Sequence, residues 1–219
     1  MIGDHCISAI SDAYCKGIRN FDVDKAYEGM RKNAFEAPSN PDEYKNGMGR
    51  RALASYLEYG YIPLEDGVPD AFHTKEQVSR TLEYAYDDFA LAQMAKALGK
   101  TDDYQVLIQR AANYRNVIDS RTGYAQGRHA DGTFLNDANA FNFARFITEG
   151  APCHYTWYVP QDPYGLMDCM GGKDKYVAKL DSMFSEQRYW HGNEPVIRLP
   201  ICSIMQASLG KLNVPSGIL

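Results

Sequence analysis

Residues 75–98 constrain the fold more than any other stretch, because apolar side chains recur there at helical spacing for six turns. This spacing is typical of an amphipathic helix, which buries one face against other elements. Gly99 follows directly and is typical of a helix C-terminal cap. The segment therefore predicts one long helix. Its apolar positions are Val78, Leu82, Ala85, Phe89, Ala92, Met94 and Ala95.

The rest of the chain also has the pattern of helices joined by polar loops. Asp22 is placed to cap a helix over residues 22–36, and Asp162 is placed to begin another over 162–170. Further helices are predicted at 5–18, 50–58, 101–118, 138–148 and 173–184. No stretch alternates apolar and polar residues for long enough to predict a strand, and no strict repeat period occurs. The pattern predicts an all-α fold, either a helical toroid or a bundle.

Composition places the chain among ordinary globular proteins. Its 219 residues, 45% hydrophobic and 23% charged, suffice for one compact domain, or two at most. The net charge of −5 argues against nucleic acid or an anionic membrane as a partner. Residues 1–10 lack the features of a signal peptide, and no apolar run is long enough to span a bilayer. Five widely spaced cysteines without a CxxC pair favour reduced thiols over a metal site or disulfide framework.

The stretch 146–166, FITEGAPCHYTWYVPQDPYGL, carries the clearest candidate for acid catalysis. Glu149 stands at a predicted helix end and is followed by Tyr155, Trp157 and Tyr158. Aromatic neighbours would partly desolvate this carboxyl and raise its pKa, as a general acid requires. The alternative is a solvated Glu at a helix C-terminus, which the residues alone favour.

Three other clusters could serve a site. The turn YWHGNEP at 189–195 could donate hydrogen bonds to sugar hydroxyls or supply oxygen ligands to calcium, but it could equally be an ordinary polar turn. Asp4 could line a site or simply cap the first helix. Glu83 and Asp87 lie four apart on one helical face, where a solvated face is commoner than a functional pair of acids.

Taken together, five blocks resemble glycoside hydrolase family 92, the calcium-dependent exo-α-mannosidases. MIGDH, SRTLEYAYDD, EG…YTWYVPQD, GLMDCMGGKDKYVAKLD and YWHGNEP occur in the family's order between residues 1 and 195. The resemblance implies an incomplete (α/α)6 barrel-like helical toroid from the family's catalytic domain. It also implies inverting release of terminal α-linked mannose from glycans such as N-glycan or mannan termini.

The resemblance implies roles for individual residues. Glu149 matches the general acid that protonates the departing glycosidic oxygen. His191, Asn193 and Glu194 match the part that contacts the leaving-group sugar. Asp4, His5, His154 and Trp157 lie in blocks that border the substrate pocket. Calcium is the implied cofactor, since it holds mannose hydroxyls in this family, but the resemblance does not assign its ligands.

Two features depart from the family pattern. The family's activating base belongs to a GNDD-type motif that this chain lacks, and the family's upstream β-sandwich is missing. After NEP the family continues S/C-H-Q-I/V-A-H/Y-M-F-N-Y-A-G. One DNA sequence that encodes those residues, read in the frame produced by deleting its first nucleotide, encodes VIRLPICSIMQ. This is the sequence found from residue 196. Residues 196–219 also contain none of the 28 acidic residues.

We therefore interpret residues 1–195 as a partial family 92 helical domain and residues 196–219 as an out-of-frame tail. The expectation is a truncated glycosidase with weak or no activity, derived from a longer parent that is exported through a signal upstream of Met1. Two alternatives stay open: an (α/α)6-type glycosidase for another α-linked sugar, and a non-enzymatic helical scaffold that binds a protein.

Overall fold

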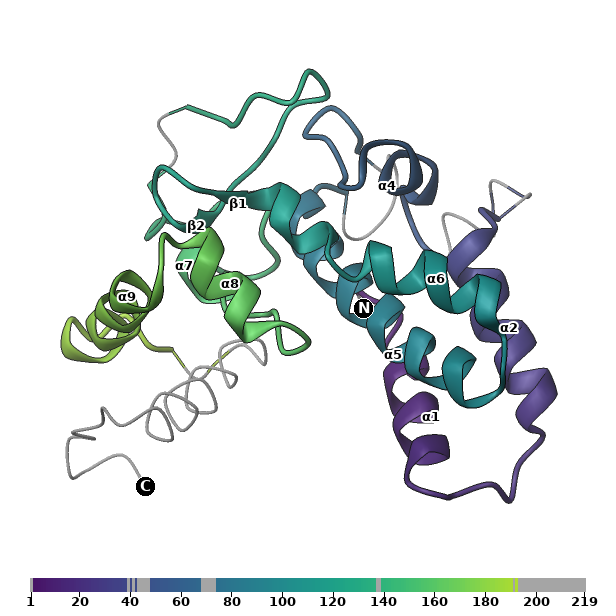
Figure 1. Cartoon of the computed structure of the whole chain (residues 1–219). Helices are drawn as coiled ribbons and strands as arrows, with labels where there is room; N and C mark the ends of the chain where they lie inside the picture. The colour runs from purple at the N-terminus through teal and green to yellow at the C-terminus, as the bar shows by residue number, and fades with distance from the viewer. Residues whose placement is uncertain are drawn as a thin grey trace.

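The computed structural model describes residues 2–38, 40, 42, 48–67, 74–136, 139–190 and 192, and these form a largely helical molecule (Figure 1). The predicted all-α class is confirmed. Within this part, the one strand pair is short and antiparallel: Ile118 pairs with Ala125, and Asp119 with Tyr124. The elements are α1 (Cys6–Cys15), α2 (Val23–Phe35), α4 (Leu53–Tyr59), α5 (Gln77–Ala97), α6 (Thr101–Arg110), the 3-10 helix η1 (Asn113–Val117), β1 (Ile118–Asp119), β2 (Tyr124–Ala125), α7 (Pro152–Tyr155), α8 (Pro163–Cys169) and α9 (Lys173–Ser185).

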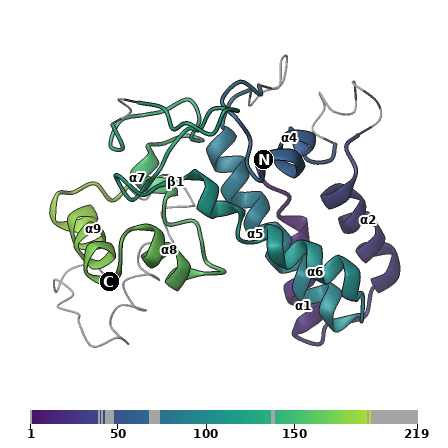
Figure 2. The ribbon, with the colours of Figure 1, turned by 45° about the horizontal axis from the view of Figure 1, so that its top comes forward.

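Helix α5 is the central element, and the sequence predicts it well. It runs over Gln77–Ala97, and Gly99 beyond it adopts a left-handed backbone with φ of 72°. Helices α1 and α6 lie along α5, with α2 outside them (Figures 1 and 2). The burial of α5 extends well beyond one apolar stripe, because neighbours cover it on several sides.

The two larger hydrophobic cores meet at α5, and a third, smaller cluster joins α4 to Tyr84 of α5. The C-terminal half of α5 packs with α1, α2 and α6, whereas its N-terminal half packs with η1, β2 and α7–α9 (Figure 1). This arrangement makes α5 the element through which the two halves of the molecule contact each other. Representative side chains are Ile7, Met30, Leu91 and Leu107 in the first core, and Leu82, Tyr114, Trp157 and Leu180 in the second.

Helix caps follow the sequence where a local signal exists. The Asp22 carboxylate accepts a hydrogen bond from the Lys25 amide at 3.0 Å and begins α2. Asp162 likewise accepts from the Gly165 amide at 2.8 Å and begins α8. Each carboxylate satisfies an amide that the first helical turn leaves unpaired.

The helix predicted over 138–148 is wrong. Residues 139–150 form turns and bends that dock on the N-terminal end of α5. The Val78 amide donates to the Phe146 carbonyl at 3.1 Å, and the Asn139 side chain accepts from the Phe141 amide at 2.9 Å. These contacts take the place of helical hydrogen bonds.

Other boundaries also differ from prediction. Helix α6 ends at Arg110 and gives way to η1, so the chain does not form one helix to residue 118. Helix α4 starts at Leu53, after Ala52 in a left-handed conformation with φ of 56°. The short α7 has no counterpart among the predicted helices.

Candidate functional site

Four charged side chains of α5 are buried, although the sequence favours a solvated face for its acids. Arg80, Asp87 and Asp88 are 0% exposed, and Glu83 is 3% exposed. The solvated-face interpretation is therefore wrong. A carboxylate is buried in this way only where cations or hydrogen-bond donors reach it.

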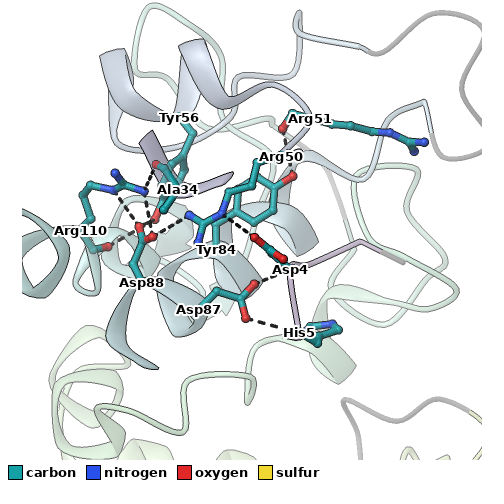
Figure 3. A network of polar contacts seen from close by, with 10 residues as sticks. All are labelled: Asp4, His5, Ala34, Arg50, Arg51, Tyr56, Tyr84, Asp87, Asp88 and Arg110. Carbon is teal, nitrogen blue, oxygen red and sulfur yellow. Dashed lines mark hydrogen bonds and ion pairs between the residues drawn. The ribbon is translucent and has the colours of Figure 1, made fainter. Parts of the chain in front are cut away.

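Asp88 binds two arginines that come from elsewhere in the chain (Figure 3). Arg50 Nη1 lies 2.6 Å from Asp88 Oδ1. Arg110 donates in bidentate fashion, from Nε to Oδ2 and from Nη2 to Oδ1, both at 2.8 Å. The Tyr56 hydroxyl donates to Oδ2 at 3.1 Å. The cluster ties α5 to α6, to α4 and to the segment before α4.

His5 lies against the other two buried acids of α5. Its Nδ1 is 3.7 Å from Asp87 Oδ1 and its Nε2 is 2.7 Å from Glu83 Oε2. Asp87 and Glu83 together outweigh the effect of burial and raise the pKa of the imidazole to about 10. His5 is therefore a cation near neutral pH, fixed between two carboxylates.

Glu83 joins two blocks that lie far apart in the sequence. The Tyr155 hydroxyl donates to Glu83 Oε1 at 2.9 Å, while His5 contacts the other carboxylate oxygen. The predicted site residues Asp4 and His5 are thus brought into one polar network with the stretch that follows Glu149. No local pattern signals Arg50 or Arg110 as members of this network, and the sequence interpretation missed both.

Glu149 is exposed at the end of a well-anchored loop. The Thr148 amide donates to Ser79 Oγ at 2.9 Å, and the Ala144 amide donates to the Gly150 carbonyl at 3.3 Å. Glu149 itself has a φ of 52°, a left-handed conformation that costs a non-glycine residue about 1 kcal/mol. The expected desolvation by flanking aromatics is absent here, because the side chain faces solvent.

His154 connects this loop to the segment after α9. Its Nδ1 accepts from the Ala151 amide at 3.2 Å, so its Nε2 carries the proton that is donated to the Arg188 carbonyl at 3.1 Å. Burial lowers the pKa of His154, which favours this neutral form. Its ring also lies 6.2 Å from the ring of Trp190.

The remaining predicted site residues divide into two groups. Trp157 is 1% exposed and packs edge-on against Tyr176, with ring centroids 5.2 Å apart. It lies in the core beneath the Glu149 loop, and a contact with substrate stays a prediction. His191, Asn193 and Glu194 lie outside the described residues.

The described acids of α5 are paired with cations rather than grouped as metal ligands. These cations are Arg50, Arg110 and His5. Among the described residues, no group of three or more His, Cys, Asp or Glu side chains is arranged to hold a metal ion. No helix in the same part of the chain is both long and apolar enough to cross a membrane.

The arrangement places the exposed Glu149 next to a buried network of charged groups on α5. A carboxyl group acts as a general acid only in its protonated form, which desolvation favours. Inverting hydrolysis needs a second carboxylate about 6.5–9.5 Å away to activate water.

Comparison with known proteins identifies the class. The model of the glycosyl hydrolase family 92 catalytic domain matches residues 1–202. A protein named an uncharacterized secreted glycosidase, from Arthroderma benhamiae, is 31% identical over 88% of this chain and 28% of its own length.

Two solved structures are similar in fold. The family GH92 α-mannosidase BT3965 from Bacteroides thetaiotaomicron has 36% identity and a TM-score of 0.79, over 92% of this chain and 25% of its own. The family GH92 inverting mannosidase BT2199 from the same species has 31% identity and a TM-score of 0.74, over 96% and 27%. The chain thus spans about a quarter of the length of these relatives.

The helical fold and these likenesses define a glycoside hydrolase domain. The expected incomplete helical toroid agrees with the match to these structures. The chain belongs to glycosyl hydrolase family 92.

Proposed function

We propose that this chain is the part of an exo-α-mannosidase that supplies the general acid, Glu149. The observation that carries the proposal is the Glu149 backbone. Glu149 is exposed, and its backbone is held in a left-handed conformation by a loop that is anchored to Ser79 of α5. Strained positions of this kind persist where the surrounding structure enforces them, and they cluster at active sites. Family membership and the two mannosidase structures support the same assignment.

In the proposed reaction, Glu149 protonates the glycosidic oxygen of a terminal α-mannoside as the bond to C1 breaks. A water molecule, activated by a carboxylate from outside the motifs of this chain, attacks the opposite face, so the configuration inverts. Because the chain spans about a quarter of its relatives, this activity is proposed for the protein that contains it.

Substrate, cofactor and location are part of the same proposal. The substrates are α-mannoside glycans such as N-glycan or mannan termini. Calcium is proposed as the cofactor and would hold mannose hydroxyls, as the family resemblance implies. The name of the Arthroderma relative supports export of the parent protein.

The proposal is tested by mannose release from an α-linked mannobiose, first with this chain and then with the protein read through a restored frame after codon 195. Each protein is assayed with calcium and with EDTA, and NMR detects which anomer of mannose forms. We expect β-mannose to form first and EDTA to stop the reaction. Glu149→Gln should lower the rate about 100-fold or more, as loss of a general acid does. Glu58→Gln, an exposed Glu on α4, is the matched control and should leave the rate unchanged.

Three results would contradict this assignment. If Glu149→Gln retains the wild-type rate, Glu149 is not the general acid. If a sugar other than mannose is released, the chain belongs to a glycosidase of different specificity. If the chain alone releases nothing, the same variants are compared in the protein read through a restored frame after codon 195. Absence of release there as well overturns the proposal and favours a binding scaffold.

A further inference from the structure

A cavity of about 320 Å³ opens beside the start of α1, and Glu149 is not among the residues that line it. Its walls include Asp4, Asn33, Gly49, Arg50 and Tyr84. The volume lies at the lower end of the range for small-molecule pockets. In Figure 3 the side chains of Asp4 and Arg50 point toward each other.

In this cavity, Asp4 and Arg50 each have a buried polar atom without a hydrogen-bond partner among the described residues, although the Asp4 carboxyl also has a side-chain contact with Asn33. Arg50 Nε and Asp4 Oδ2 lie 3.8 Å apart, which is within ion-pair range but too long for a hydrogen bond. Neither atom has another hydrogen-bond partner, and Arg50 Nη2 also has none. Arg50 is 1% exposed, so the unsatisfied donors are costly.

Contacts with α5 position the Asp4 backbone and the Arg50 side chain. The Asp4 amide donates to Asp87 Oδ2 at 2.7 Å, which fixes the backbone of Asp4. Arg50 Nη1 is bound to Asp88 at 2.6 Å, and the guanidinium lies 5.0 Å from the centre of the Tyr84 ring. The gap is therefore preorganised for a third group.

The pairing of a cationic donor with an anionic acceptor restricts the ligand. A hydroxyl can accept from Arg50 Nε and donate to Asp4 Oδ2 at once. An anion would face the Asp4 carboxylate, and an ammonium would face the Arg50 guanidinium. Aromatic rings such as that of Tyr84 also offer apolar contact to a sugar.

We propose that this cavity is a binding subsite for a neutral polyhydroxylated ligand, a sugar, one hydroxyl of which bridges Arg50 and Asp4. In taking a sugar as the ligand, the inference rests on the proposed function. It goes further by proposing that Arg50 itself binds a sugar hydroxyl, in a cavity that Glu149 does not line.

A titration of the ¹⁵N-labelled full chain with methyl α-mannoside, followed by amide chemical shifts, tests the subsite. We expect saturable shifts at Gly3 and Gly49, beside the cavity, that inorganic phosphate does not reproduce. Asp4→Ala should weaken this binding about tenfold or more, because it leaves the ligand hydroxyl and Arg50 unpaired. Asp12→Ala on α1, whose side chain is 60% exposed, is the matched control and should bind as wild type does.

The amide of Gly150 separates this inference from the proposed function. Shifts at Gly150 alone would place the mannoside at the Glu149 loop, which overturns the subsite and leaves the general acid standing. Shifts at Gly3 and Gly49 with phosphate only, or unchanged affinity in Asp4→Ala, would also overturn it. If Asp4→Ala does not fold, Arg50→Lys retains a cation for Asp88 and should weaken mannoside binding by a similar factor.

Discussion

Single residues of the same type behave in opposite ways in this molecule. His5 lies between Asp87 and Glu83, and its pKa is raised to about 10. His154 is also partly buried, but its hydrogen bonds go to backbone groups and none of the described carboxylates pairs with it, and burial lowers its pKa. Burial disfavours the cation in both, so the neighbouring carboxylates decide the direction. His5 is thus a structural cation, whereas His154 is a neutral link between the Glu149 loop and residues 188–190.

The raised pKa of His5 predicts a pH dependence of folding. Its contribution is fully present below the unfolded pKa of about 6.5, and it is lost as pH rises through about 10. Because about a third of the side chain is exposed, we expect a loss of only about 1–2 kcal/mol in the free energy of unfolding.

Denaturant unfolding of wild type and His5→Gln between pH 6 and 10 measures this contribution. The stability difference between the two proteins should shrink as pH rises. A difference that stays constant over the whole range would exclude His5 as the titrating group.

At the residue scale, the sequence predicts what is local. Asp22 and Asp162 are recognisable as caps because their partners lie three residues ahead. The burial of Glu83 and Asp88 is not recognisable, since their partners Tyr155 and Arg50 are 72 and 38 residues away. An acid on a helix looks solvated until the distant group that binds it is known.

At the scale of elements, the sequence predicts which residues form α5 but not which elements pack around it. Its apolar period marks the residues that enter the two cores. Its acids occupy the remaining faces, where α1, α6 and the segment before α4 bring cations to them. The 139–150 loop is the opposite case. Its amides and carbonyls bond to α5, so helical spacing in its own sequence does not decide its structure.

The Asp88 cluster predicts a large energetic effect for α5. Asp88→Ala leaves the guanidinium of Arg50 buried without its anion and removes the bidentate contact of Arg110. Breaking a buried pair in this way costs about 3–5 kcal/mol. Denaturant unfolding should show this loss, whereas Asp181→Ala on the exposed face of α9 should change stability by about 0.5 kcal/mol or less. Equal stability of the two variants would mean that the cluster contributes no net energy.

At the scale of the whole molecule, the family is predictable from the motifs and their order, and the fold shows that these motifs contact one another. MIGDH and SRTLEYAYDD meet through His5 and Glu83, and YTWY joins them through Tyr155. Motifs that are separate in the sequence are therefore parts of one packed network. A complete catalytic site is not predictable from these motifs, because they offer Glu149 as one candidate acid and the proposed inverting reaction would need a second carboxylate.

The last prediction concerns the gene, because the catalytic base that the proposed reaction needs is expected from a motif that this sequence does not contain. If one base was lost near codon 196, restoring it should replace VIRLPICSIMQ by the family's sequence after NEP and open a frame that encodes GNDD downstream. Sequencing of the locus on both sides of this reading frame tests that directly.

The restored protein supplies the functional control. With both carboxylates present, it should release mannose in the presence of calcium, and Glu149→Gln in the same background should abolish the release, because a base without an acid leaves the glycosidic oxygen unprotonated. DNA that confirms every codon through 219, with no GNDD-coding segment in any downstream frame, would exclude the frameshift. The base would then have to come from a separate polypeptide, and mixing this chain with candidate partners becomes the decisive assay.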